Sequence, residues 1–72
     1  MRKYKILKMN VTGEATLCAE CDSIEFATTA ADKLAQELKD NKEYDKVLIK
    51  ELKNDKYKGV GEIYIEQNKE NK

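Results

Sequence analysis

Only one stretch of this chain has the residue spacing of an amphipathic helix. Its apolar side chains recur at intervals of three and four residues: Ile24, Ala27, Ala31, Leu34, Ala35 and Leu38. Asp22 is the expected N-cap, with Glu25 three residues later at the spacing of a capping box. We expect the helix to end near Asp40 and Asn41, because asparagine is common at helix C-termini. A single helix is therefore available to cover whatever sheet the rest of the chain forms.

Four segments have the alternation that is typical of β-strands: residues 4–11 and 15–21 before the helix, and residues 44–52 and 62–66 after it. Residues 53–58 have the composition of a polar loop. The order β-β-α-β-β predicts a two-layer α+β domain, with the helix on one face of a mainly antiparallel four-stranded sheet. We expect one domain over residues 1–66 and a disordered polar tail over residues 67–72.

The loop between the first two strands decides which of their side chains share a face, because a shift of one residue exchanges the faces. A two-residue turn at Thr12 and Gly13 would put Leu7 on the side of Cys18. A three-residue loop with Gly13 as a bulge gathers the apolar residues instead, and we adopt it. The helix side of the sheet is then predicted to receive Leu7, Met9, Leu17, Ala19, Val47, Ile49, Ile63 and Ile65.

The opposite face of the sheet has no second helix to cover it. It is predicted to carry a mixture of tyrosine, cysteine and aliphatic side chains: Tyr4, Ile6, Cys18, Leu48 and Tyr64. Charged residues frame this group, namely Lys8, Lys46, Lys50, Glu20, Glu62 and Glu66. Scattered exposed apolar residues are normal on small proteins, but tyrosine is enriched at contact surfaces. We therefore predict a non-catalytic protein-binding module that acts through this face or an edge strand.

The residues predicted to contact the partner are Tyr4, Ile6, Leu48 and Tyr64. The partner is expected to be another protein or, in a homodimer, a second copy of the chain. A chain of 72 residues buries little surface by itself, so a partner that covers apolar groups would add to its stability.

An alternative hypothesis is weak binding of nucleic acid. Lys and Arg number 14 and Asp and Glu also 14, so the net charge is zero, which argues against a dedicated nucleic-acid-binding protein. The charge is nevertheless uneven, because the first nine residues hold four basic and no acidic side chains, whereas residues 10–40 hold seven acidic and two basic ones. The residues that would bind nucleic acid in this alternative are Lys3, Lys5, Lys56, Tyr57 and Lys58.

The sequence predicts no catalytic residues, cofactor, metal site or small-molecule substrate. Cys18 and Cys21 form the only motif-like pair, but on a strand residues three apart point to opposite faces. A zinc site would need two further ligands, and the chain has no histidine and no other cysteine. The lack of histidine also removes the commonest general base at neutral pH.

No apolar run approaches the ~20 residues needed to cross a membrane, and no signal peptide is recognisable. We therefore expect a cytoplasmic location without membrane association, in which both cysteines stay reduced. The proline-free composition, rich in lysine, asparagine and glutamate, is similar to that of proteins from low-GC bacteria, their phages and plasmids.

Overall fold

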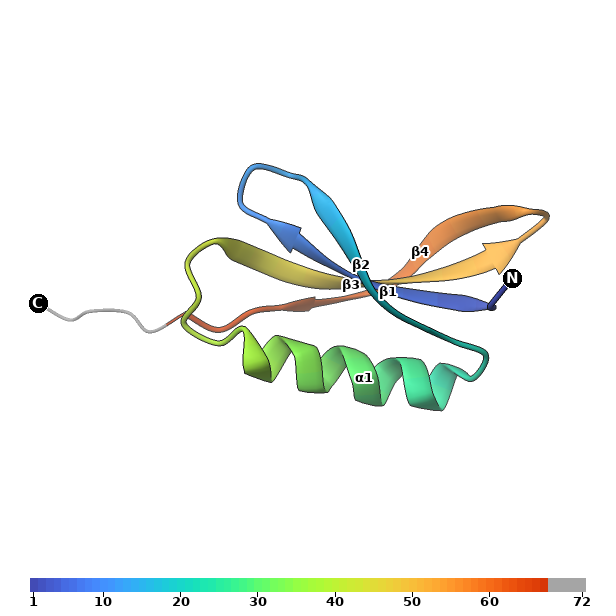
Figure 1. Cartoon of the computed structure of the whole chain (residues 1–72), viewed down its shortest axis with the longest axis horizontal. Helices are drawn as coiled ribbons and strands as arrows, with labels where there is room; N and C mark the ends of the chain where they lie inside the picture. Colours follow the sequence, from blue (N-terminus) through green and yellow to red (C-terminus); the bar gives the residue numbers. More distant parts are fainter. Residues whose placement is uncertain (68–72) are drawn as a thin grey trace, which may run out of the picture.

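The computed structural model describes residues 1–67. In these residues the elements follow the order β1 (Tyr4–Asn10), β2 (Ala15–Cys21), α1 (Ile24–Glu37), β3 (Tyr44–Lys53) and β4 (Lys56–Tyr64). The strands form one antiparallel sheet in the order β2-β1-β3-β4, and α1 packs against one of its faces (Figure 1). The predicted β-β-α-β-β architecture is thus confirmed.

The end of the described chain is tied to the loop before β3. Ile65 is buried, and the side-chain Nε2 of Gln67 donates to the carbonyl oxygens of Asn41 and Tyr44, each at 3.1 Å. The rest of the predicted tail, residues 68–72, lies outside the described residues.

The helix begins one residue later than the sequence suggests. Its N-cap is Ser23, whose hydroxyl oxygen accepts hydrogen bonds from the backbone N–H groups of Glu25 at 3.1 Å and Phe26 at 3.4 Å. The prediction of Asp22 as N-cap is wrong, because its carboxylate binds the N-terminal segment instead of the first turn of the helix. One oxygen of Asp22 accepts from the backbone N–H of Lys3 at 2.9 Å, and the other pairs with Arg2 at 2.8 Å.

Small residues on one side of α1 allow close packing on the sheet. Ala27, Ala31 and Ala35 are buried, as is Leu38 at the C-cap. The predicted apolar stripe is therefore confirmed at its centre and its C-terminal end. Ile24, in the first turn, is about half exposed.

The first hairpin has the predicted three-residue loop. The backbone N–H of Asn10 donates to the carbonyl oxygen of Glu14 at 2.9 Å, so Val11, Thr12 and Gly13 form the loop. Gly13 has a φ of 96°, a conformation that glycine adopts without steric cost. The predicted loop geometry is confirmed.

The second hairpin is tighter than expected. Asn54 and Asp55 have φ angles of 51° and 66°, and Lys53 pairs with Lys56 across them. Two consecutive left-handed residues form the type of turn that joins twisted strands most compactly. The prediction of a polar loop over residues 53–58 is therefore wrong, since Lys56, Tyr57 and Lys58 belong to β4.

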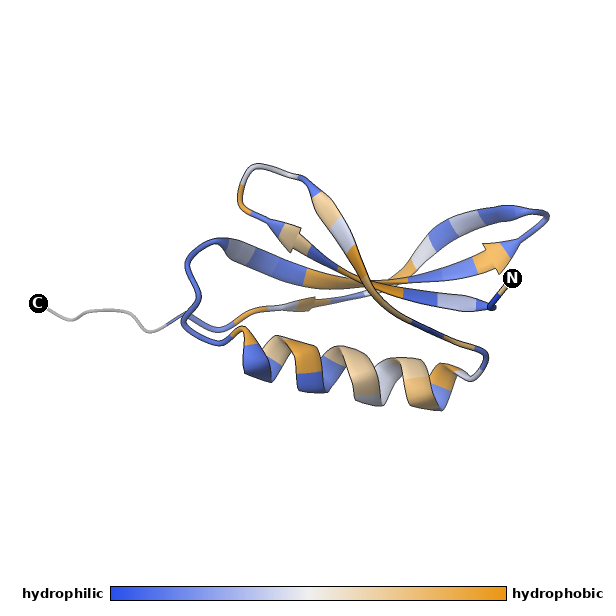
Figure 2. Ribbon diagram, in the orientation of Figure 1, coloured by the Kyte–Doolittle hydropathy of each residue, from blue (hydrophilic) through white to orange (hydrophobic). Residues whose placement is uncertain are grey.

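The core contains the side of β1 that was expected to face away from the helix. Tyr4 is 7% exposed and Ile6 only 1% exposed, and both pack in the core with Val47, Ile49 and Ile65. The placement of Tyr4 and Ile6 on the uncovered face was therefore wrong. Figure 2 shows that the tip of the β3–β4 hairpin consists of hydrophilic residues.

Two register features explain this correction. Ile6 lies directly opposite Ile49, so Leu7 lies opposite Leu48 and shares its face. In β2, Ile6 pairs with Ala19 and Leu7 with Leu17, which leaves Cys18 as the extra residue of a β-bulge. The bulge turns Leu17 to the other face from Ala19, whereas the prediction had assumed unbroken alternation along β2.

Candidate functional site on the uncovered face of the sheet

The face of the sheet opposite α1 has an aliphatic centre on its two central strands. Leu7 and Met9 on β1 alternate with the buried side chains of this strand, as do Leu48 and Leu52 on β3. We define the outer face by the residues that strand alternation and register place on this side: Lys5, Leu7, Met9, Leu17, Glu20, Lys46, Leu48, Lys50, Leu52, Tyr57, Glu62 and Tyr64. In Figure 1 this side of the sheet has no helix on it.

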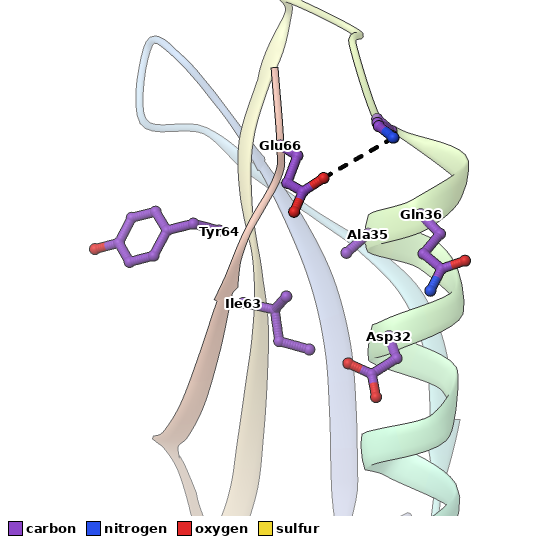
Figure 3. Close-up of a pocket in the computed structure, with 7 residues that line it drawn as sticks. Asp32, Ala35, Gln36, Ile63, Tyr64 and Glu66 are labelled. Atoms are coloured by element: carbon purple, nitrogen blue, oxygen red, sulfur yellow. Dashed lines mark ion pairs between the residues drawn. The ribbon is translucent and has the colours of Figure 1, made fainter. Parts of the chain in front are cut away.

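The two neighbours Ile63 and Tyr64 show the division between the faces. In Figure 3 Ile63 points toward α1, whereas Tyr64 points away from it. Tyr64 is 66% exposed, and Ile63 is half-buried against the core. The outer face therefore presents a largely free tyrosine at its β4 edge.

One lysine of the outer face already has a partner. The Nζ of Lys46 lies 3.3 Å from Oε1 of Glu62 and 5.4 Å from the centroid of the Tyr64 ring. The hydrogen bond to Glu62 raises the pKa of Lys46. Its charge is thus largely compensated within the chain.

The other two lysines of the outer face lie directly opposite each other, Lys5 on β1 and Lys50 on β3. The Nζ of Lys5 lies 4.1 Å from the centroid of the Tyr57 ring. The Tyr57 hydroxyl donates to the carbonyl oxygen of Arg2 at 2.6 Å, which holds the start of β4 against the N-terminal segment. Among residues 1–67 neither lysine forms an ion pair within 4.0 Å.

A hollow of about 340 Å³ lies beside Lys50. It is formed by Leu48, Lys50 and a segment of β4 that comprises Gly59, Val60, Gly61 and Glu62. Ile49 pairs with Gly61 and Lys50 with Gly59, so Val60 is the extra residue of a second bulge. Gly59 has no side chain to fill the space opposite Lys50, which leaves the hollow open toward the outer face.

Of the residues predicted to bind a protein, Leu48 and Tyr64 lie on the outer face, whereas Tyr4 and Ile6 do not. The hydroxyl of Tyr4 donates to Oε2 of Glu51 at 3.2 Å in the core layer. Burial and the adjacent Glu51 carboxylate raise the pKa of Tyr4. Tyr4 and Ile6 therefore stabilise the fold and are not available to a partner.

The outer face also contains residues that the sequence pattern does not place there. Leu7, Met9 and Leu17 were expected beneath the helix, and Leu52 and Tyr57 were not linked to this face. Because β1 is apolar on both sides, alternation alone does not show which side is buried. Only its pairing with β3 reveals this.

The residues predicted to bind nucleic acid are brought together in part. Lys5 and Tyr57 are in contact, and Lys56 and Lys58 are exposed on β4 of the same hairpin. Lys3 lies 3.7 Å from Oε2 of Glu51, which offsets its charge. This end of the molecule is basic, but acidic residues are interspersed in it.

Cys18 and Cys21 do not form a joint site. Both thiols are free, Cys18 is exposed on the bulge and Cys21 is half-buried. The thiol of Cys18 donates to the carbonyl oxygen of Thr16 and that of Cys21 to Ser23. Within the described part of the chain, no group of three or more His, Cys, Asp or Glu side chains is positioned to hold a metal ion.

A second concave region of about 450 Å³ lies between α1 and the end of β4 (Figure 3). Its lining mixes the apolar Ala35 and Ile63 with Asp32 and with an ion pair between Lys39 and Glu66 at 3.9 Å. Tyr64 also borders this region, so the groove adjoins the rim of the outer face. It provides oppositely charged groups but no nucleophile beside a base.

Across residues 1–67 the structure holds no helix with the length and apolar character needed to traverse a lipid bilayer. Comparisons of the chain with protein-family models, with curated proteins and with solved structures found no match.

Proposed function

We propose that this protein is a small non-catalytic binding module that occupies a partner protein through its outer face. The single observation that supports this proposal is the aliphatic centre of that face, Leu7, Met9, Leu48 and Leu52, on the side of the sheet opposite α1. An antiparallel sheet that faces water on one side normally carries polar residues there. The proposal includes a cytoplasmic setting, in which Cys18 and Cys21 stay reduced.

The arrangement of the outer face resembles that of an interaction surface. Half-buried aliphatic side chains form the centre, exposed Tyr64 lies at one edge, and charged residues surround them. Protein interfaces have this layout of an apolar core within a polar rim, with tyrosine over-represented. Covering the centre would remove apolar surface from water, which is favourable by roughly 25 cal/mol of free energy for each Å².

The proposal is tested by photo-crosslinking in the source cell. The chain has two exposed aromatic residues on opposite layers, Tyr64 on the outer face and Phe26 on α1, which is 71% exposed. Replacing each in turn with p-benzoylphenylalanine gives a matched pair of probes. We expect Tyr64→p-benzoylphenylalanine to yield a defined adduct with another protein, and Phe26→p-benzoylphenylalanine to yield none of the same mass.

The captured protein is then purified and its binding to the unmodified chain is measured by calorimetry. We expect saturable binding that Leu48→Lys weakens by about ten-fold or more, as for truncation of a central interface residue. Equal adducts from both probes, or an affinity that Leu48→Lys leaves unchanged, would contradict the proposal. Circular dichroism of each variant checks that it is folded.

A homodimer is the alternative occupant of the same face. Sedimentation of the purified chain at high concentration distinguishes it, because a dimer that Leu48→Lys converts to a monomer would identify a second copy as the partner. A monomeric mass at millimolar concentration would remove this alternative.

Nucleic-acid binding is a second candidate, supported by the contact between Lys5 and Tyr57 and by the nearby Lys56 and Lys58. Its test is fluorescence anisotropy with a labelled single-stranded oligonucleotide at several salt concentrations. Binding that weakens steeply with salt and is reduced in Lys56→Gln/Lys58→Gln would support it. The absence of binding at low salt would exclude it.

A further inference from the structure

The charges of the outer face are not balanced around the aliphatic centre. Lys46 is paired with Glu62, whereas Lys5 and Lys50 lie opposite each other on adjacent strands. Like charges directly opposite in an antiparallel pair are destabilising. The chain therefore places two lysines at directly opposite positions of the outer face, and neither forms an ion pair among residues 1–67.

The residues next to Lys5 and Lys50 offset the positive charges of these two lysines only in part. Glu20 on β2 is opposite Lys5 in register, but its carboxylate is not within ion-pair distance. Tyr57 offers Lys5 its ring face at 4.1 Å. Lys50 has Gly59 opposite on its other side and thus no side chain to pair with there.

The apolar groups around the lysine pair indicate what kind of anion fits. Leu7 and Leu48 lie two residues along the same strands and on the same face, a separation of about 7 Å. The hollow beside Lys50 is bordered by Leu48 and Val60. A complementary surface would therefore carry an acidic group and aliphatic or aromatic groups a few ångströms apart.

We infer that the partner of the outer face is an acidic protein surface, with a carboxylate over Lys5 and Lys50 and apolar side chains over Leu7, Leu48 and the hollow. This inference rests on the proposed function and names the chemistry of the partner. Aliphatic centres favour protein over nucleic acid, because bases stack on aromatic rings, and Lys5 already occupies one face of Tyr57.

The test is a selection from a random-peptide display library on the full chain, followed by affinity measurements with the selected peptides. We expect enrichment of peptides that combine Asp or Glu with Leu, Ile, Val or Phe. Their affinity should fall by about ten-fold or more in Lys5→Gln/Lys50→Gln, the range of close charge pairs at interfaces. It should also fall with rising salt. The matched control is Lys33→Gln/Lys39→Gln, with Lys33 on α1 and Lys39 just after its C-cap, which should leave the affinity unchanged.

The outcomes separate this inference from the proposed function. Selected peptides that lose affinity in Leu48→Lys but not in Lys5→Gln/Lys50→Gln, or that lack acidic residues, would overturn the acidic partner and leave the binding face intact. Peptides insensitive to Leu48→Lys, or no enriched peptides, would overturn both. A labelled oligonucleotide that binds the chain and loses affinity in Lys5→Gln/Lys50→Gln would assign the lysine pair to nucleic acid and overturn the inference.

Discussion

Ile6 on β1 lies directly opposite Ile49 on β3, and both side chains are buried between the sheet and α1. This pair belongs to the continuous ladder that runs from Tyr4 opposite Glu51 to Met9 opposite Lys46, and within it the alternation from Ile6 and Ile49 sets the face of each residue. Because side chains alternate along a strand, burying Ile6 turns Leu7 outward, and burying Ile49 does the same for Leu48. The aliphatic centre of the outer face is a consequence of this register.

Ile6→Ala should destabilise the protein far more than Leu7→Ala, although the residues are neighbours. Truncating a buried isoleucine costs about 2–5 kcal/mol, a large part of the stability available to a domain this small. Leu7 loses much less contact because no helix covers it. Urea denaturation followed by circular dichroism measures both, and equal losses would show that the face assignment is wrong.

Asp22→Asn should lower stability at neutral pH, and the effect should disappear in acid. Hydrogen bonds from the backbone N–H of Lys3 and from the Arg2 guanidinium lower the pKa of Asp22 below its usual value of 3.8. A depressed folded-state pKa contributes stability that is full above the unfolded value and is lost as pH falls through the folded value. The urea midpoints of the two proteins should therefore differ at pH 7 and converge below pH 3.8.

The control for this prediction is Asp32→Asn, because Asp32 is exposed on α1 and has no ion pair within the described residues. Its effect on the urea midpoint should be small at both pH values. A difference between wild type and Asp22→Asn that persists unchanged into acid would contradict the role of the carboxylate.

Asp55→Gly should stabilise the second hairpin. Asp55 has a φ of 66°, and a non-glycine residue in the left-handed region is strained. Asn-Gly is the preferred pair for this turn. Relief of a left-handed conformation that costs about 1–2 kcal/mol exceeds the roughly 0.4–1 kcal/mol that glycine costs through the entropy of the unfolded chain, so we expect a net gain in the free energy of unfolding. Asp55→Val should lower it. Thermal unfolding of the three proteins gives the order, and a loss in Asp55→Gly would contradict the turn geometry.

Lys50→Glu should stabilise the free protein while damaging the binding of an acidic partner. It replaces a like-charge pair with Lys5 by an opposite-charge pair, which is worth about 0.2–1 kcal/mol across strands. The gain in the urea midpoint should shrink at high salt because exposed charges are screened. A lower midpoint than wild type at low salt would show that Lys5 and Lys50 do not repel each other.

The sequence predicted the candidate site only in part. Leu48 and Tyr64 follow from the alternation of their own strands, in which one side is clearly more apolar. Tyr4 and Ile6 were misplaced because β1 alternates between two apolar sides, and the pattern within a strand does not rank them. Asp22 was misassigned because local capping rules do not include its contact with the N-terminal segment.

The sequence by itself determined the elements and their order, since helical and strand periodicity and the glycine of the first loop act over a few neighbouring residues. It also determined that one helix must serve a four-stranded sheet. Only the tertiary structure decided which side of β1 is buried, where Cys18 and Val60 interrupt the ladders, and that Lys5 lies opposite Lys50. These outcomes depend on pairing between strands distant in the chain, which is selected by the packing of the whole core against α1.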